Sequence, residues 1–326
     1  MFKQIQINMM HVVLLCSFLL FSTYASNINA DTEFRPPGKF IYLDNQIMYI
    51  DCLGDSSPTV LIDVGLGDSS ANWYKLARKL SKEVRVCVYD RAGYGWSNTG
   101  PGERTTEQIT YELSRLLMKA EIPAPYVLVG HSFGGFTARY FATVFPEQTA
   151  GIVLVDSSHP EQIERLAELD NIQMNEPLKI TRREPAPDWM NQFEKKWYQL
   201  NSSRKAIVAQ MSELKDFAKS AEQVSNLGQM PNIPLAVISR GKTQLPEIDG
   251  IALEGEWQSM QKDLLSLSKN SWQEIIENSG HQIYFDAPDA IIRNIMKVVE
   301  LARNSKSKFF SYYHYYDEQV NSRYYF

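Results

Sequence analysis

Residues 126–144 constrain the fold of this chain more strongly than any other stretch. An apolar run at 126–129 predicts a buried strand, and apolar side chains at 136–144 recur at helical spacing. Between them lies the pentapeptide GHSFG at 130–134, which matches the pattern G-x-S-x-G. Glycine lacks a Cβ, so strand and helix can approach closely around such a turn. The stretch therefore predicts Ser132 at the apex of a strand–turn–helix unit, which is the context of a nucleophile elbow.

Strand-like and helical patterns alternate along most of the remaining chain. The first two strands are expected as a hairpin that turns at Asp44 and Asn45. The predicted strands are 40–43, 46–52, 59–64, 84–89, 126–129, 151–155, 234–239 and 272–276, and the predicted helices 72–80, 106–120, 136–144, 256–266 and 288–302. This order predicts an α/β fold, with a mostly parallel, doubly wound sheet of about eight strands and helices on both faces. Ligands of such sheets bind beyond the carboxyl ends of the strands.

Residues 157–231 interrupt the alternation. They contain three amphipathic helical stretches, near 160–170, 188–200 and 203–225, and no strand pattern. We expect a helical lid here, inserted into an α/β core formed by 31–156 and 232–303. Its aromatic side chains favour a small acyl substrate with an apolar or aromatic part. The tyrosine-rich tail at 304–326 receives no assigned role.

The N-terminus has the pattern of a secretory signal peptide. Lys3 precedes an apolar run at 9–21, and small residues follow it. Cleavage is expected after Ala25, with Ala30 as the later alternative, so the mature protein would be secreted or periplasmic. The apolar run is short for a membrane span. An uncleaved N-terminal anchor is the alternative, and membrane contact is expected only through this segment.

Composition and motifs limit the classes of partner and cofactor that we expect for this chain. The net charge is −5 and no basic patch is visible, which argues against nucleic-acid binding. The sequence shows no metal cluster, phosphate loop or cofactor motif, so we expect neither a cofactor nor a metal. Cys52 and Cys87 lie in apolar, strand-like contexts that are typical of buried thiols, although an exported protein could pair them.

Four motifs in order resemble the α/β-hydrolase superfamily, in particular its lid-bearing group. They are GLG at 65–67, DRAGYGWS at 90–97, GHSFGG at 130–135 and GH at 280–281, and the resemblance spans about 40–303. The group includes esterases, prolyl-type aminopeptidases, epoxide hydrolases and haloalkane dehalogenases. The last two use aspartate at the elbow. A serine there favours acyl transfer from esters, amides or thioesters to water.

The resemblance also implies the catalytic base. Ser132 is a poor nucleophile without a base in hydrogen-bond contact, and histidine suits this role near neutral pH. His281 follows the last predicted strand, where the family keeps its base. His159 follows the strand at 151–155 and is expected as a partly exposed loop residue, with the lid entrance as its alternative place.

The acid is less well defined by the sequence. Many relatives carry it after the strand at 234–239, where this chain has Gln244. Asp156, at the end of the preceding strand, is the favoured candidate, as in some lid-bearing relatives. Asp249 is the alternative acid, and Glu247 and Glu254 lie in the same part of the chain.

The backbone N–H groups of Leu66 and Phe133 are expected to form the oxyanion hole. Asp90 and Arg91 are expected to brace a strand end rather than to contact substrate. The sequence thus predicts an exported serine hydrolase that cleaves an ester or amide through Ser132, His281 and Asp156 and a covalent acyl-enzyme. The alternatives are a non-catalytic binding protein on the same fold, and an acyltransferase or peptidase that uses the same triad.

Overall fold

The computed structural model describes residues 36–100, 102–169, 192–243 and 250–309. The predicted signal peptide and most of the tyrosine-rich tail lie outside these residues. So do Gln244, Glu247 and Asp249.

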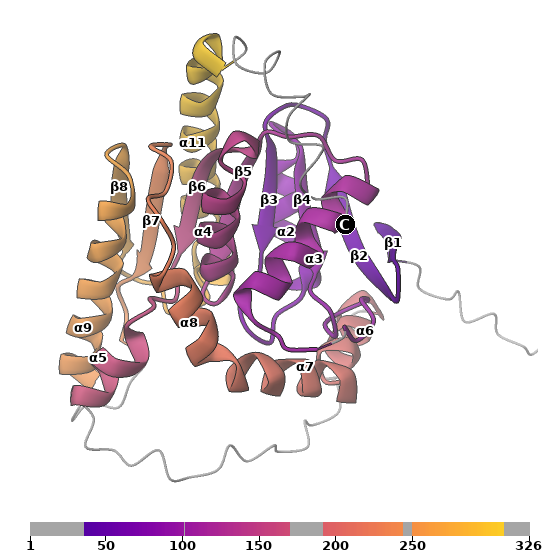
Figure 1. Ribbon diagram of the computed structural model, residues 1–326, viewed down its shortest axis with the longest axis horizontal. Helices are drawn as coiled ribbons and strands as arrows, with labels where there is room; N and C mark the ends of the chain where they lie inside the picture. The colour runs from indigo at the N-terminus through magenta and orange to yellow at the C-terminus, as the bar shows by residue number, and fades with distance from the viewer. Residues whose placement is uncertain (1–35, 101, 170–191, 244–249, 310–326) are drawn as a thin grey trace, which may run out of the picture. The chain divides into compact units, whose positions relative to one another are not determined.

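The described residues contain one sheet of eight strands, in the order β1-β2-β4-β3-β5-β6-β7-β8 (Figure 1). The strands are β1 (Lys39–Leu43), β2 (Gln46–Leu53), β3 (Thr59–Asp63), β4 (Val86–Asp90), β5 (Tyr126–His131), β6 (Thr149–Val155), β7 (Leu235–Arg240) and β8 (Ser271–Ile276). β2 is antiparallel to both of its neighbours, and all other neighbours from β4 to β8 pair in parallel. The predicted mostly parallel sheet is therefore confirmed.

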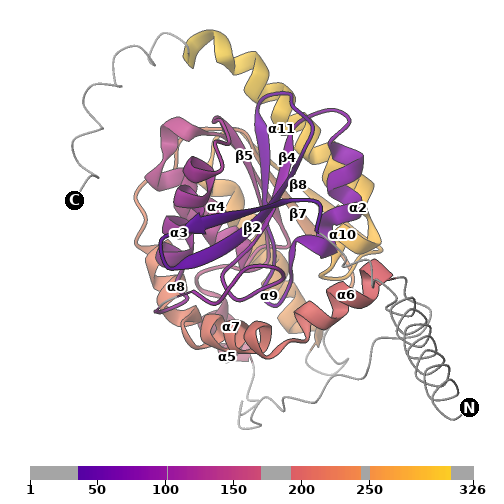
Figure 2. The same cartoon turned by 90° about the vertical axis from the view of Figure 1, so that its right-hand side faces the viewer.

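Helices cover both faces of this sheet (Figure 2). One face packs against α2 (Ser70–Leu80), α10 (Ile283–Asp286) and α11 (Pro288–Phe309), and the other against α3 (Thr106–Lys119), α4 (Gly134–Val144) and the 3₁₀ helix η2 (Leu264–Leu267). β5 shows how one strand serves both: Val127 and Val129 face the first layer, whereas Leu128 faces the second. Successive side chains of a strand point to opposite faces, so a strand buried on both sides reads as a continuous apolar run.

The insertion between β6 and β7 is helical in its described parts. It contains α5 (Gln162–Leu169), α6 (Gln192–Asn201), α7 (Arg204–Lys215) and α8 (Phe217–Ser225), which Figure 1 shows beyond one end of the sheet. The predicted single helix at 203–225 is two helices. Asp216 separates them, with φ −91° and ψ 6°, and its carboxylate accepts a hydrogen bond from the Arg104 backbone N–H at 2.7 Å.

α9 (Gly250–Asp263) begins earlier than the predicted helix at 256–266. Gly250 and Gly255 weaken the helical pattern of this segment, because glycine disfavours a helix interior. Burial of Leu253 and Trp257, each 7% exposed, offsets that preference. Among the helices of the described ranges, none is long and apolar enough to cross a membrane.

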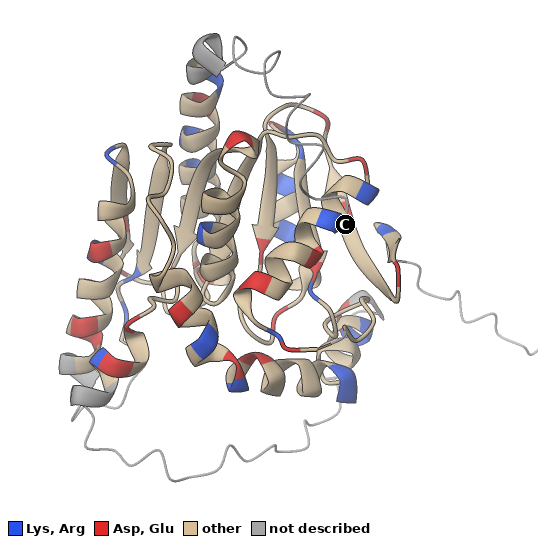
Figure 3. Ribbon diagram, in the orientation of Figure 1, with Lys and Arg blue, Asp and Glu red and all other residues tan. Residues whose placement is uncertain are grey.

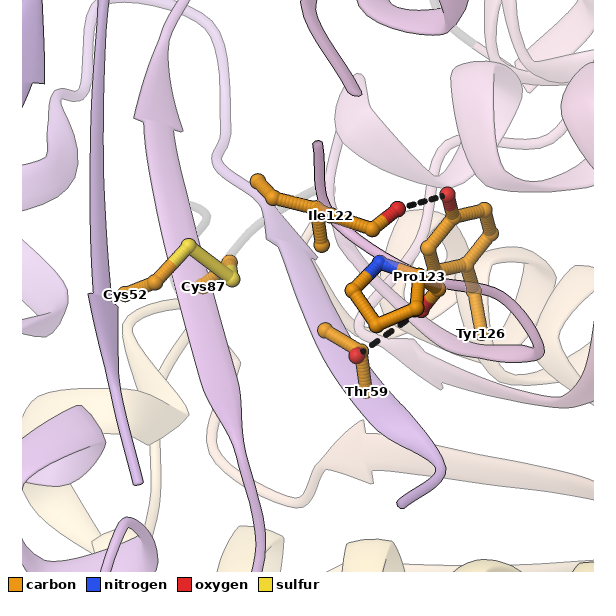
Figure 4. The surroundings of a disulfide bond; sticks show 6 residues. All are labelled: Cys52, Thr59, Cys87, Ile122, Pro123 and Tyr126. Atoms are coloured by element: carbon orange, nitrogen blue, oxygen red, sulfur yellow. Dashed lines mark hydrogen bonds between the residues drawn. A yellow bond between two sulfur atoms is a disulfide. The ribbon is translucent and has the colours of Figure 1, made fainter. Parts of the chain in front are cut away.

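Cys52 and Cys87 form a disulfide, so the interpretation of these residues as buried thiols was wrong (Figure 4). They lie directly opposite each other in the antiparallel pair β2–β4, with their Cα atoms 4.1 Å apart. Pairing depends on the register between two strands that are distant in sequence, which no local pattern indicates.

Candidate active site

Ser132 lies at the sharp turn between β5 and α4. Its φ is +50°, in the left-handed region that side chains other than glycine rarely adopt. Backbone hydrogen bonds hold this conformation: the Ser132 N–H donates to the Val155 carbonyl at 3.1 Å, and the Ser132 carbonyl accepts from Ser158 N–H at 3.0 Å. The end of β6 and the residues that follow it therefore support the turn.

The glycines of the pentapeptide are required by close backbone packing. A Cβ on Gly130 would lie 2.6 Å from the Gly135 Cα, and a Cβ on Gly134 would lie 2.3 Å from the Asp63 carbonyl oxygen. Both distances are shorter than any contact that a real side chain makes. The strand, the turn and the helix can therefore close around Ser132 only when these positions are glycine.

Asp156 and His281 meet at the same end of the sheet. Asp156 directly follows β6, and His281 lies in the loop after β8. His281 Nδ1 is 2.6 Å from Asp156 Oδ2; the Asp156 side chain is fully buried and that of His281 is 28% exposed. Because an ionised carboxylate can only accept, Nδ1 carries the hydrogen and Nε2 keeps its lone pair. That is the tautomer a general base needs.

The charge of Asp156 is supported by further donors. Arg240 Nη1 lies 2.9 Å from Oδ2, and Trp257 Nε1 lies 2.8 Å from Oδ1. Burial acts to raise the pKa of Asp156, but the His281 hydrogen bond and the Arg240 charge outweigh it and hold that pKa below its usual range. Asp156 is therefore ionised at neutral pH.

His131, next to Ser132 in sequence, connects the turn at Ser132 to the loop that carries His281. Its Nε2 lies 3.0 Å from the His281 carbonyl oxygen, and the two imidazole rings are 4.7 Å apart. Burial, reinforced by the nearby His281, lowers the pKa of His131 to about 3. His131 is thus neutral and donates to the carbonyl, and its 3.7 Å approach to Asp68 is not an ion pair.

The described residues show no hydrogen bond between Ser132 Oγ and the His281 imidazole. Hydrogen bonds of this kind are often long before substrate binds, and proton transfer needs the two atoms at about 2.6–3.2 Å. The structure therefore places the Asp156–His281 pair at the turn that carries Ser132, but the hydrogen bond from Ser132 Oγ to the His281 imidazole is not formed.

Two backbone N–H groups flank Ser132. A Cβ on Gly65 would lie 3.4 Å from the Ser132 Cβ, so the chain that leads into Leu66 runs beside the elbow. Arg91 Nη2 donates to the Gly65 carbonyl at 3.0 Å. Because a trans peptide is planar, this bond also fixes the direction of the Leu66 N–H, which points the opposite way. In the described part of the chain, neither this N–H nor that of Phe133 has a hydrogen-bond partner.

The alpha/beta hydrolase fold family model matches residues 58–231, which is more than half of the chain. The chain belongs to this family. YqjL of Bacillus subtilis (strain 168), an uncharacterised protein, is 28% identical over 73% of this chain and 82% of its own length.

Solved structures agree with this assignment. The esterase from Exiguobacterium antarcticum superposes with a TM-score of 0.58 at 16% identity, over 81% of this chain and 99% of that one. A protein of Pseudomonas aeruginosa PAO1 described as a probable hydrolytic enzyme gives 0.61 at 18%, over 82% and 95%. These likenesses show the fold, and membership of the family supports hydrolase activity.

Arg91 of this α/β hydrolase braces the strand ends, as predicted. The side chain is fully buried and pairs with Asp63 at 2.6 Å and with Glu213 of α7 at 2.8 Å. Tyr94 also donates to Glu213, at 2.9 Å. This network connects the peptide before Leu66 to the helical insertion.

The remaining sequence candidates lie elsewhere. His159 is buried, 8% exposed, rather than partly exposed as expected. Glu254 pairs with Arg240, and Asp249 lies outside the described residues. Sequence reasoning did not single out Arg240 or Trp257 as partners of Asp156. A signal for Arg240 existed, since it ends β7, the strand next to β6.

Proposed function

We propose that this chain is an exported serine hydrolase that cleaves carboxylic esters, with amides as the second substrate class. The observation that carries this proposal is the 2.6 Å contact between Asp156 and His281 at the elbow that presents Ser132. Nucleophile, acid and base follow one another along the chain in the order usual for this fold.

The acylation step follows from these positions. Ser132 Oγ attacks the acyl carbon while His281 Nε2 takes its proton, and the carbonyl oxygen becomes an oxyanion. The N–H groups of Leu66 and Phe133 donate to that oxyanion. The tetrahedral intermediate collapses, the bond to the leaving alcohol breaks, and His281 returns its proton to the alcohol oxygen.

Deacylation repeats these steps with water as the nucleophile. His281 takes a proton from water, whose oxygen attacks the acyl carbon of the Ser132 ester. The second tetrahedral intermediate releases the carboxylic acid, and His281 returns the proton to Ser132 Oγ. Asp156 stays ionised throughout, orients the imidazole and stabilises its charged form.

An apolar part in the substrate is supported by the surroundings of the oxyanion donors. Leu66 is partly buried and packs against a cluster of buried side chains that includes Phe133, and Phe217 of α8 packs against the same cluster. Phe217 also stacks against Phe136, with ring centroids 5.4 Å apart. The helical insertion thus supplies apolar surface beside the proposed oxyanion hole, as a lid would.

Export is supported by the predicted signal peptide and by the disulfide between Cys52 and Cys87. Disulfides persist in oxidising compartments such as the periplasm and the extracellular space. Fractionation of cells that express the full chain tests this part, because a cytoplasmic protein with its N-terminus intact would contradict it.

Catalysis is tested with matched p-nitrophenyl esters and p-nitroanilide amides of short and aromatic acids. Ester hydrolysis is expected to vanish in Ser132→Ala at an unchanged thermal midpoint, and to persist in Ser114→Ala, which removes an exposed hydroxyl from α3. Hydrolysis that survives in Ser132→Ala would reject the mechanism. Transfer of the acyl group to an added alcohol in preference to water would favour an acyltransferase instead.

A further inference from the structure

Arg139 is a buried cation whose side chain has no hydrogen-bond or ion-pair partner among the residues that the structure describes. It lies in the second turn of α4, on the helix that follows Ser132, and is only 7% exposed. Its Nε and Nη1 atoms are buried, and neither makes a hydrogen bond. The arginines at 91, 104 and 240, which are also buried, each pair with a carboxylate. Arg139 therefore differs from the other buried arginines of the described residues.

Such an arrangement opposes folding. A buried charge that lacks an opposite charge and hydrogen bonds destabilises a protein. Burial lowers the pKa of Arg139 to about 10, and no carboxylate of the described ranges acts against this effect. The guanidinium is still protonated at neutral pH, so an anion that binds beside it would stabilise its charge.

The Arg139 side chain lines an open cavity of about 840 Å³ between α4, α8 and α9. Thr143 and His159 contribute polar groups to its wall, and Met230, Leu264 and Leu267 contribute apolar surface. The volume is in the range of small-molecule sites, which combine apolar walls with a few polar groups.

The acidic side chains of this cavity are already paired. Glu161 and Asp263 both contact Arg165 of α5, at 3.4 and 2.6 Å. Figure 3 shows this mixture of acidic and basic residues along α5 and α9. Neither acid therefore serves as the counter-ion of Arg139.

His159 adds a neutral donor to the same cavity. Its Nδ1 accepts the Glu161 backbone N–H at 3.2 Å, so the ring hydrogen lies on Nε2. Burial, and then the charge of Arg139, lower the pKa of His159 to about 4, which keeps it uncharged at neutral pH. The cavity thus offers a buried cation at Arg139, an exposed one at Lys262 and a neutral N–H donor at His159.

We propose that this cavity is a binding site for a small organic carboxylate, held by Arg139 at its charged end and by Met230, Leu264 and Leu267 along its apolar body. Hydrogen bonds from a charged guanidinium to a carboxylate are about twice as strong as those between neutral groups. None of these residues takes part in the proposed triad, so the site stands apart from catalysis at Ser132.

The test uses the mature protein with Ser132→Ala as the background, which prevents turnover. Calorimetric titration with 4-phenylbutyrate is compared with its uncharged amide and with inorganic phosphate. Saturable binding of the carboxylate is expected, with much weaker binding of the amide and of phosphate. Arg139→Gln should weaken carboxylate binding roughly 10- to 150-fold, the loss expected for hydrogen bonds to a charged group. Arg204→Gln, which removes an exposed arginine from α7, should leave binding unchanged.

A second variant keeps the proposal testable if Arg139→Gln fails to fold. Arg139→Met fills a similar volume without charge and should raise the thermal midpoint of the unliganded protein by about 2–4 °C while abolishing carboxylate binding. Equal binding in wild type and Arg139 variants, or no carboxylate binding at all, would overturn the site. Phosphate binding as tight as that of 4-phenylbutyrate would overturn the ligand class.

Discussion

Arg91 and Glu213 join the core to the helical insertion through two parallel hydrogen bonds, Nε to Oε1 at 2.8 Å and Nη2 to Oε2 at 3.0 Å. Both side chains are fully buried. The Nη2 atom also donates to the Gly65 carbonyl, one peptide from the proposed oxyanion donor Leu66. One ion pair therefore links the position of the insertion to the geometry beside Ser132.

Glu213→Ala should destabilise the protein by about 3 kcal/mol, because truncating one partner leaves a buried charge incompletely paired. Urea unfolding measures this loss. Glu213→Gln keeps an oxygen acceptor and should lose less. If the two variants and the wild type unfold within about 0.5 kcal/mol of one another, the ion pair does not hold the insertion to the core.

Asp156→Asn should lower kcat by about 10⁴-fold with little change in KM, since an amide cannot hold the imidazole in the tautomer that leaves Nε2 free. Steady-state hydrolysis of the best ester substrate gives both constants. Glu254→Gln is the matched control, because Glu254 contacts Arg240 but not His281.

Asp249→Asn separates the two candidate acids. It should retain the activity of the wild type, because Asp156 already occupies His281 Nδ1. A loss of activity in Asp249→Asn together with an active Asp156→Asn would transfer the acid role to Asp249.

His159 should make stability depend on pH. In the unfolded chain it takes up a proton below about pH 6.5. In the folded protein burial delays this uptake to about pH 4. Because the unfolded state binds more protons in that window, the free energy of unfolding falls by roughly 1.4 kcal/mol per pH unit as the pH is lowered.

The variant His159→Gln isolates this contribution from that of other groups. Its unfolding free energy, measured by urea denaturation between pH 4.5 and 6.5, should decline less steeply than that of the wild type by roughly 1.4 kcal/mol per pH unit. Identical slopes would mean that His159 titrates normally in the folded protein.

Replacement of both Cys52 and Cys87 by serine should destabilise the protein by about 2–4 kcal/mol, since the disulfide closes a long loop in the unfolded chain. Intact mass after alkylation of the denatured mature protein should show no free thiol before reduction and two after it. Two free thiols before reduction would contradict the bond.

The regular elements were predictable from sequence, because their signals are local. The apolar run at 126–129 and the helical spacing at 136–144 identify β5 and α4, and the glycines between them identify the turn at Ser132. The hairpin at Asp44 was equally visible, and Asp44 indeed has a positive φ. Such patterns depend only on residues that are close together in the chain.

The features that the sequence missed depend on three-dimensional proximity. The Cys52–Cys87 bond needs a strand register, and the isolation of Arg139 depends on which acids lie near it. Sequence left Asp156 and Asp249 as alternatives because both could reach the loop after β8. The structure places Asp156 against His281, and its role as the acid stays a prediction that Asp156→Asn tests.

Covalent labelling of the mature protein with a fluorophosphonate, scored by intact mass, measures whether Ser132 is the reactive nucleophile. We expect one adduct per wild-type chain, no adduct in Ser132→Ala, and sharply slower labelling in Asp156→Asn. An adduct that persists in Ser132→Ala, or a wild type that remains unlabelled while it hydrolyses esters, would contradict the assignment of Ser132 as the nucleophile.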